Sequence, residues 1–247
     1  VIGTTRSRTS NGLQYILPSN LGGFYGEAMY AFGEQPDNAG APAGSFEDNG
    51  NYYGGRIGFK SGPLDIAISA GLTEVNVNVP AGSILSDDRS VVNAGITYDF
   101  GVIKLFGLYS KQTRDNFSWT GLNLGGGVSS AAGGDAEADA YSIGLTVPFG
   151  PGTFKAGYSS LELKNGNGPG STPSADKFAI GYQYDLSKRT ALYVTYASLK
   201  NKDAGAGANA TGGLTAGASR QRGLAGTAVT SPTSTSTAFD IGIRHNF

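Results

Sequence analysis

The chain has 247 residues, of which only 39 % are hydrophobic and 40 are glycine, and its formal net charge is −1. This length suits one large β domain or two ordinary domains. So few apolar residues would hardly fill the core of a soluble protein, whereas a wall one residue thick needs only one apolar face. The near-zero net charge indicates no attraction to nucleic acid. The sequence contains no cysteine, no apolar stretch long enough for a membrane helix and no apolar leader at its start.

Period-2 alternation dominates the chain, and helical periodicity is almost absent. The alternation predicts eleven strands, at 11–18, 23–33, 51–60, 63–76, 88–100, 102–113, 138–148, 152–164, 175–185, 188–200 and 236–247. In the fourth of these, Leu64, Ile66 and Ile68 share one face, while Asp65 and Ser69 share the other. Aromatic residues gather near strand ends on the apolar face, which is typical of the girdles of a membrane barrel.

The connections between the predicted strands alternate between short and long. Short connections lie at 18–22, 61–62, 101, 149–151 and 187–188, and long ones at 34–50, 77–87, 114–137, 164–174 and 201–235. Short turns at one rim and long loops at the other are typical of outer-membrane β-barrels, and a soluble sandwich has no reason to sort its loops in this way. The sequence therefore predicts an all-β fold, namely a transmembrane antiparallel β-barrel.

The odd number of predicted strands indicates that this chain alone does not form a complete barrel. With eleven strands the first and the last run in the same direction, so they cannot pair as antiparallel neighbours, and an open edge would leave unpaired backbone groups in lipid. Parity predicts an odd number of further strands before Val1, which makes residues 1–247 the C-terminal part of one barrel domain. The alternative is a twelfth strand hidden in 201–235, around GLTAGASRQRG.

Three stretches carry a family resemblance: SNGLQYILPSNLGGFYGEAMYAFG at 10–33, DLSKRTALYVTYASLKNKDA at 185–204 and GIRHNF at 242–247. They resemble the strand and turn after the constriction loop, the penultimate hairpin and the terminal signature of the general trimeric porins of Gram-negative bacteria, in particular the β-proteobacterial type. The resemblance spans essentially the whole chain. It implies a sixteen-stranded barrel, of which about eleven strands are represented here, without the N-terminal strands and most of the constriction loop.

The resemblance also implies a function and partners. The protein would be an integral outer-membrane porin, a water-filled channel for passive diffusion of ions and small hydrophilic solutes, and a homotrimer that uses no cofactor or metal. Its other partners would be outer-membrane lipid, lipopolysaccharide and the barrel-assembly machinery, with no nucleic acid. In the family that machinery reads the C-terminal aromatic strand, which here would present Phe239, Ile241, Ile243 and Phe247.

Charged side chains within the strands are expected to face water, because Arg or Lys at mid-membrane costs about 2–4 kcal/mol on the lipid face. The alternation assigns ten of them to the pore: Glu27, Arg56, Lys60, Asp65, Asp99, Lys104, Lys155, Lys177, Asp240 and Arg244. Six of these are cationic, which favours weak anion selectivity unless many of them sit near the rims. The resemblance adds Arg8 as one of the clustered arginines of the constriction; the alternative is a stray loop arginine.

Two other classes of function compete with the channel. A structural or adhesive barrel would have a lumen plugged by large inward side chains, whereas the inward positions Gly54, Gly95 and Gly144 leave space. An outer-membrane hydrolase would need a histidine in the lumen, but His245 is the only one and lies on the outward face. The sequence therefore predicts a channel and not an enzyme.

Overall fold

The structure is a computed structural model of the chain, and it describes residues 11–33, 50–79, 83–86, 88–115, 135–164, 174–202 and 235–246. Over these ranges every regular element is a strand, and no helix is present that is long and apolar enough to cross a membrane. Eleven strands form one antiparallel sheet in chain order: β1 (Gly12–Ile16), β2 (Phe24–Ala31), β3 (Tyr52–Ser61), β4 (Leu64–Thr73), β7 (Arg89–Asp99), β8 (Lys104–Arg114), β9 (Ala136–Phe149), β10 (Gly152–Lys164), β11 (Ser174–Asp185), β12 (Thr190–Lys202) and β13 (Thr235–His245).

Each of the eleven predicted strands overlaps one strand of this sheet, so the predicted all-β antiparallel architecture is confirmed. The long connection at 77–87 contains an element that was not predicted, because β5 (Asn76–Val79) and β6 (Ser83–Ser86) pair as a separate hairpin. The alternating Val and Asn residues at 75–79 are a strand pattern that the length of the connection had hidden. The proposed extra strand around GLTAGASRQRG lies outside the described residues.

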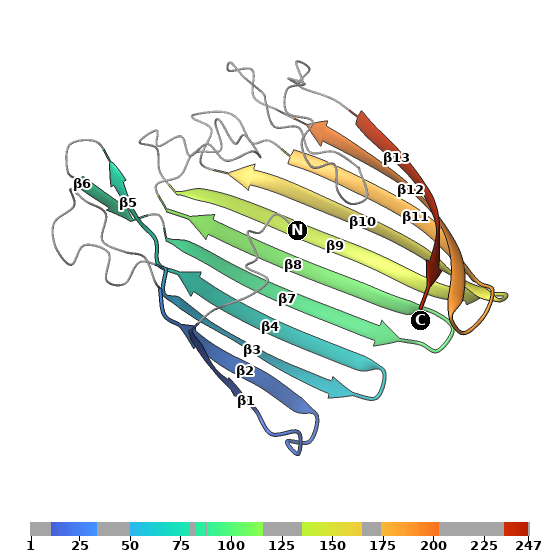
Figure 1. Cartoon of the computed structure of the whole chain (residues 1–247), viewed down its shortest axis with the longest axis horizontal. Helices are drawn as coiled ribbons and strands as arrows, with labels where there is room; N and C mark the ends of the chain where they lie inside the picture. Colours follow the sequence, from blue (N-terminus) through green and yellow to red (C-terminus); the bar gives the residue numbers. More distant parts are fainter. Residues whose placement is uncertain are drawn as a thin grey trace.

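The short connections all lie along one rim of the sheet, as Figure 1 shows. The turns between β3 and β4 and between β9 and β10 leave only two residues between the strands, at 62–63 and 150–151. Gly62 and Gly150 adopt φ values of 53° and 57°, in the left-handed region that glycine enters without a steric penalty. Because neighbouring strands are antiparallel throughout, the longer connections fall at the opposite rim.

The register of the strands divides the sheet into two faces, because directly paired residues project to the same side. Arg56 pairs with Glu27 on β2 and with Ser69 on β4, whereas its neighbour Ile57 pairs with Ile68 on the other face. The second face, called the apolar face below, carries a series of exposed aliphatic side chains: Leu13, Ile57, Ile66, Ile68, Val92, Ile96, Leu105, Ile143, Leu192, Ile241 and Ile243. The opposite side is called the polar face.

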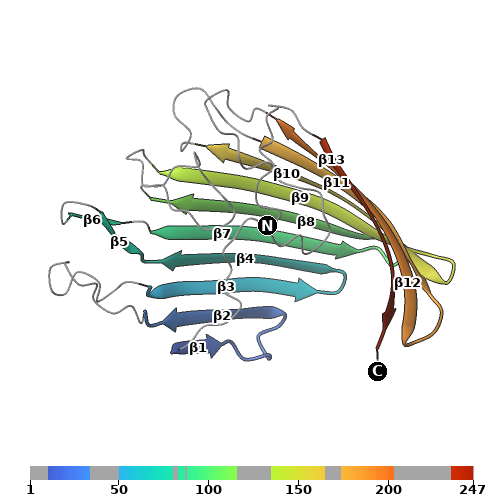
Figure 2. The ribbon, with the colours of Figure 1, turned by 45° about the horizontal axis from the view of Figure 1, so that its top comes forward.

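The sheet forms a single curved layer with almost no interior (Figures 1 and 2). Among the described residues, the only core cluster is the small group of Ala175, Ala197 and Leu199, and no large side chain is fully buried. The wall is therefore held together mainly by hydrogen bonds between strands, and its apolar side chains point outward rather than into a core.

Aromatic rings form two bands on the apolar face. Near the short turns, ring pairs with centroids 4.4–6.5 Å apart join Phe24 to Phe59, Tyr98 to Phe100 and Phe149 to Tyr182. Toward the long connections, pairs 5.0–6.3 Å apart join Tyr30 to Tyr53 and Tyr141 to Tyr158. On β9, Tyr141 and Phe149 are separated by about 27 Å of strand, or about 20 Å along the membrane normal at a tilt of about 40°. This spacing suits the hydrocarbon layer.

Neighbouring residues on β4 test the assignment of the faces. In the intact protein, Ile68→Arg is expected to lower the free energy of unfolding from lipid vesicles by about 2–4 kcal/mol, because the new charge would face hydrocarbon. Ser69→Arg, on the polar face, is the matched control and should cost much less. Urea titration of the folded protein in vesicles measures both values, and equal losses would contradict the assignment.

Candidate pore lining

The register brings together all ten charged residues that the alternation assigned to the pore. Glu27, Arg56, Lys60, Asp65, Asp99, Lys104, Lys155, Lys177, Asp240 and Arg244 all lie on the polar face. Phe239, Ile241 and Ile243 lie on the apolar face of β13 and are 64–73 % exposed. Arg8 and Phe247 lie outside the described residues.

The ten side chains sit at different heights on the wall. Lys60, Asp65, Asp99 and Lys104 flank the short turns, and Arg244 also lies near the short-turn end of its strand. Glu27, Arg56 and Asp240 lie near the middle of their strands, and Lys177 lies toward the long connections. Lys155 also lies near the short-turn end of its strand, so the charges at mid-height are those of Glu27, Arg56 and Asp240, and the other cations of the set lie toward the rims.

A connected set of polar contacts runs across β1 to β4. An oxygen of Glu27 lies 3.2 Å from Nη2 of Arg56, and the Gln14 amide donates to the other carboxylate oxygen over 2.9 Å. The Arg56 guanidinium lies over the ring of Tyr25, 5.6 Å from its centroid, and the Tyr25 hydroxyl donates to Asp65 over 2.5 Å. These contacts hold Arg56 against the wall and largely neutralise its charge with that of Glu27.

The other five cations of the set are not neutralised in this way. Within the described ranges, none of Lys60, Lys104, Lys155, Lys177 and Arg244 forms an ion pair with another described residue. The Lys104 ammonium lies 5.5 Å from the centroid of the Phe106 ring, and Lys155 donates to the Gln183 side chain over 3.3 Å. Among the described residues, their positive charges are therefore not balanced by an ion pair.

An open hollow lies in the polar face between β2 and β10. Gly95 and Gly144 leave space in its floor, and Tyr25, Thr97 and Lys155 contribute polar groups to its lining. Phe106 and Leu108 also line it and are 38 % and 39 % exposed. This apolar pair was not predicted, although strict alternation from Lys104 along β8 would have placed both residues on the polar face.

Two further arginines share the polar face near the long connections. Arg89 on β7 and Arg114 on β8 are direct cross-strand partners. Neither was predicted as part of the site. Arg114 fell just beyond the predicted strand, which ended at residue 113, whereas Arg89 lay inside the predicted strand 88–100 and was overlooked. Alternation continued backward from Asp99 reaches Arg89 on the same face, so the signal was present in the sequence.

The expectation that strand charges avoid the apolar face holds only between the two bands of rings. Beyond the band on the long-connection side, the described residues of β8 to β12 carry eight charged side chains on that face, which corrects the expectation: Lys111, Glu137, Asp139, Glu162, Lys164, Asp176, Lys200 and Lys202. The physical reason is position, because a lipid-facing charge is costly in hydrocarbon but not at the level of the headgroups.

A single curved antiparallel wall, apolar on one face and charged on the other, defines a β-barrel protein of the outer-membrane class. The sequence matches the Gram-negative porin family over residues 1–204, and the chain belongs to this family, as its terminal motifs had indicated.

Individual relatives agree with this assignment. The chain is 33 % identical over 248 residues to outer membrane porin protein 32 of Delftia acidovorans, covering 97 % of this chain and 57 % of that protein. It is 29 % identical over 208 residues to an outer membrane porin of Bordetella pertussis, covering 78 % and 53 %. The fold is similar to that of the anion-selective porin from Comamonas acidovorans, with a TM-score of 0.67, 29 % identity and coverage of 97 % and 60 %. The chain thus spans less than two thirds of the length of these relatives.

Substituting Glu27 or Arg56 alone is expected to shift ion selectivity in opposite directions, which tests the placement of this pair. In the intact porin, Arg56→Gln leaves Glu27 without its partner and is expected to shift ion selectivity toward cations, whereas Glu27→Gln should shift it toward anions. A unit charge about 4 Å from an ion in water contributes about 1 kcal/mol, with opposite signs for a cation and an anion, so each shift in the anion-to-cation permeability ratio is at most about thirtyfold. The reversal potential in a salt gradient measures both shifts. The double variant is the control and should lie near the wild type; shifts of the same sign would contradict the placement of the pair beside the ion path.

Proposed function

We propose that the intact protein is a porin of the Gram-negative outer membrane, which forms a water-filled channel for passive diffusion of ions and small hydrophilic solutes. The observation that carries this proposal is the division of the wall into a continuous apolar face and a face lined by charged and small side chains. Such a wall, closed into a barrel, separates lipid from water. The outer-membrane names of the relatives from Delftia and Bordetella support the location.

A closed barrel requires more strands than the eleven of this sheet. β1 and β13 are the two edges, and after ten antiparallel steps they run in the same direction. Edges left open in lipid would expose unpaired N–H and C=O groups at several kcal/mol each, by the usual order of magnitude. We infer that residues 1–247 form part of one porin domain, completed by an odd number of further strands and by a constriction loop.

Weak anion selectivity follows from the charges of the polar face. Among the ten assigned residues, Glu27 and Arg56 neutralise each other, which leaves five cations against the carboxylates of Asp65, Asp99 and Asp240. Outside that set, the polar face also carries Arg89, Arg114 and Asp185. Asp65 accepts a hydrogen bond from Tyr25, and Asp99 accepts one from the backbone N–H of Gly101. A lining with an excess of lysine and arginine favours anions. Arg8 would add a positive charge at the narrowest point, and the anion-selective relative from Comamonas supports this direction.

The proposal includes partners and excludes catalysis. The protein would assemble as a homotrimer, contact outer-membrane lipid and lipopolysaccharide, and be inserted by the barrel-assembly machinery. That machinery would read Phe239, Ile241 and Ile243 on the apolar face of β13, together with Phe247. The relatives are named as porins, which supports a channel in place of an enzyme or a plugged adhesive barrel.

Single-channel recording tests the proposal. The intact protein in a planar bilayer should give stepwise openings, and its reversal potential in a potassium chloride gradient should lie on the chloride side. Arg8→Glu should move the reversal potential toward potassium, because it replaces a positive charge at the constriction with a negative one. A folded barrel that does not conduct would contradict the channel and favour a plugged structural or adhesive barrel.

A further inference from the structure

The open hollow in the polar face, between β2 and β10, has a volume of about 570 Å³ and is partly apolar. Phe106 and Leu108 project into it from β8 and are 38 % and 39 % exposed. The passage of ions and hydrophilic solutes requires no exposed apolar pair on this face. Sites for small molecules, in contrast, combine apolar walls with a few polar groups, in volumes of about 300–1,000 Å³.

The space above the floor of the hollow is open among the described residues. A Cβ atom added at Gly144 would come no closer than 3.4 Å to its surroundings, and one added at Gly95 no closer than 3.8 Å, which are ordinary contact distances. At Gly58, in contrast, an added Cβ would collide with the ring of Tyr25, so packing requires glycine there. Because packing does not require glycine at Gly95 and Gly144, their missing side chains leave room for a solute.

Two lysines border the hollow on the side of the short turns. Lys155 lines it, and Lys104 lies beside it with its ammonium 5.5 Å from the centroid of the Phe106 ring. Thr146 of β9 is the direct cross-strand partner of both lysines, so their backbones are about 10 Å apart at the usual strand spacing. Since lysine has a flexible four-carbon stem, the two ammonium groups can approach one anion between them.

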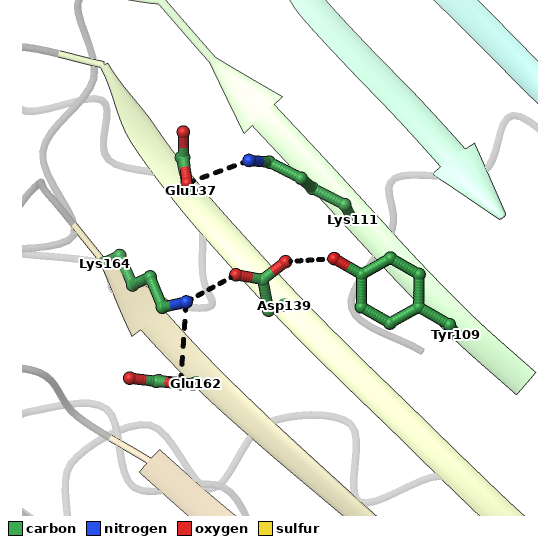
Figure 3. Close-up of polar contacts among 6 residues, drawn as sticks. All are labelled: Tyr109, Lys111, Glu137, Asp139, Glu162 and Lys164. Carbon is green, nitrogen blue, oxygen red and sulfur yellow. Dashed lines mark hydrogen bonds and ion pairs between the residues drawn. The ribbon is translucent and has the colours of Figure 1, made fainter.

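These two lysines differ from Lys164 on the apolar face, which has two carboxylate neighbours, as Figure 3 shows. The Lys164 ammonium lies 2.8 Å from Asp139 and 3.7 Å from Glu162. Lys104 and Lys155 form no ion pair with another described residue. A bound anion would supply the opposite charge that the described side chains around them do not.

Carboxylates near the hollow determine the direction in which an anionic solute would lie. Asp65 borders the hollow on β4, at the side away from β10. Asp99 is the cross-strand neighbour of Lys104, and it accepts a hydrogen bond from the backbone N–H of Gly101. Because like charges repel, the anionic end of a solute is directed toward β9 and β10, where Lys155 lies and no described carboxylate lines the hollow.

We propose that the hollow binds small carboxylates that carry an apolar ring; this inference names a class of solute for the channel proposed above and rests on that function. The carboxylate lies between Lys104 and Lys155. The ring lies over Gly144, against Phe106 and Leu108. Aromatic rings pair favourably with the Phe106 side chain, and a charge-assisted hydrogen bond from lysine holds the carboxylate.

The length of such a solute agrees with the spacing along β9. Thr146, which lies between the two lysines, and Gly144, which pairs with Phe106, are two residues apart and project to the same face. Two residues of a strand span about 7 Å. A ring with one directly attached carboxylate spans this distance, so that both of its ends are in contact at the same time.

A comparison of three solutes tests the site in the intact porin. Benzoate is the probe, acetate lacks the ring, and benzyl alcohol lacks the charge. Each is added to single channels in a planar bilayer that carry a potassium chloride current, and the fall in current gives a half-saturation concentration. Benzoate is expected to bind at least about tenfold more tightly than acetate or benzyl alcohol, because only benzoate makes both contacts.

Variants of the hollow separate the two contacts. Phe106→Ser and Gly144→Leu, which remove the ring contact and fill the floor, should each bring the affinity for benzoate down to about that for acetate. Lys155→Gln should weaken benzoate about fivefold and leave benzyl alcohol unchanged. The matched control is Lys60→Gln, which removes the same charge from the polar face outside the hollow and should leave the half-saturation concentration of benzoate unchanged.

Three results would overturn the proposal. Equal affinity for benzoate and acetate would show that the apolar pair contributes nothing to solute binding. A preference for benzoate that survives both Phe106→Ser and Gly144→Leu would place its binding elsewhere in the lumen. A wild type without benzoate binding, together with a lower unfolding temperature of Phe106→Ser, would assign the apolar pair to contact with another part of the protein.

Folding and channel function are read separately. Folding is checked by the heat-dependent shift of the barrel on electrophoresis, and Gly144→Ala, expected to lose about threefold in benzoate affinity, replaces Gly144→Leu if the larger side chain prevents folding. Equilibrium dialysis of benzoate against the folded protein in detergent measures binding without conduction. A folded protein that binds benzoate but does not conduct would refute the channel and leave the site intact, whereas a conducting protein with no preference for benzoate would do the reverse.

Discussion

A backbone N–H or C=O group in lipid finds no water, so it must pair within the protein, and a sheet can do this only by pairing every strand with its neighbours. The eleven strands follow this constraint in the simplest order, and each strand between the edge strands β1 and β13 is hydrogen-bonded to the strands before and after it in the sheet. Once the strands are paired, their side chains are forced alternately to the two faces. The apolar and polar faces are therefore consequences of backbone pairing combined with period-2 alternation.

The same constraint explains why a chain so poor in apolar residues can fold. Its exposed aliphatic side chains, such as Ile68 and Ile143, have lipid as their solvent and need no interior to fill. The polar face then has room for glycines and for charges that are only partly paired. Arg56 is held by Glu27 and Tyr25, while Lys104 and Lys155 form no ion pair with another described residue.

The wall is not uniform along its height. Between the bands of rings the apolar face carries no charge among the described residues, and beyond the outer band it carries a dense network of lysines and carboxylates. On β9, Phe149 and Tyr141 belong to the two bands of rings, and Asp139 lies beyond the outer band. The positions of charged side chains on the lipid side of a barrel thus indicate which parts of the strands lie outside the hydrocarbon layer.

Much of this architecture could be predicted from the sequence, because alternation and turn length are local signals. The ten charges of the polar face followed from parity within each strand. Features near strand ends were harder, since strand limits are poorly marked there: Arg114 fell just beyond a predicted strand, and the hairpin of β5 and β6 was hidden inside a connection. Phe106 was missed because polarity was taken to decide the face, although alternation from Lys104 places it on the polar face. The charged residues beyond the outer band of rings were missed because depth along the wall also decides where charge is tolerated.

The absence of cysteine from the sequence permits a direct test of the central claim that each strand separates water from lipid. Single cysteines at Ile66, Ala67, Ile68 and Ser69 of β4, in the intact protein in lipid bilayers, would be treated with a charged, membrane-impermeant thiol reagent. Reaction at positions 67 and 69 and protection at positions 66 and 68 is the predicted result. Equal reaction at all four positions would contradict the account.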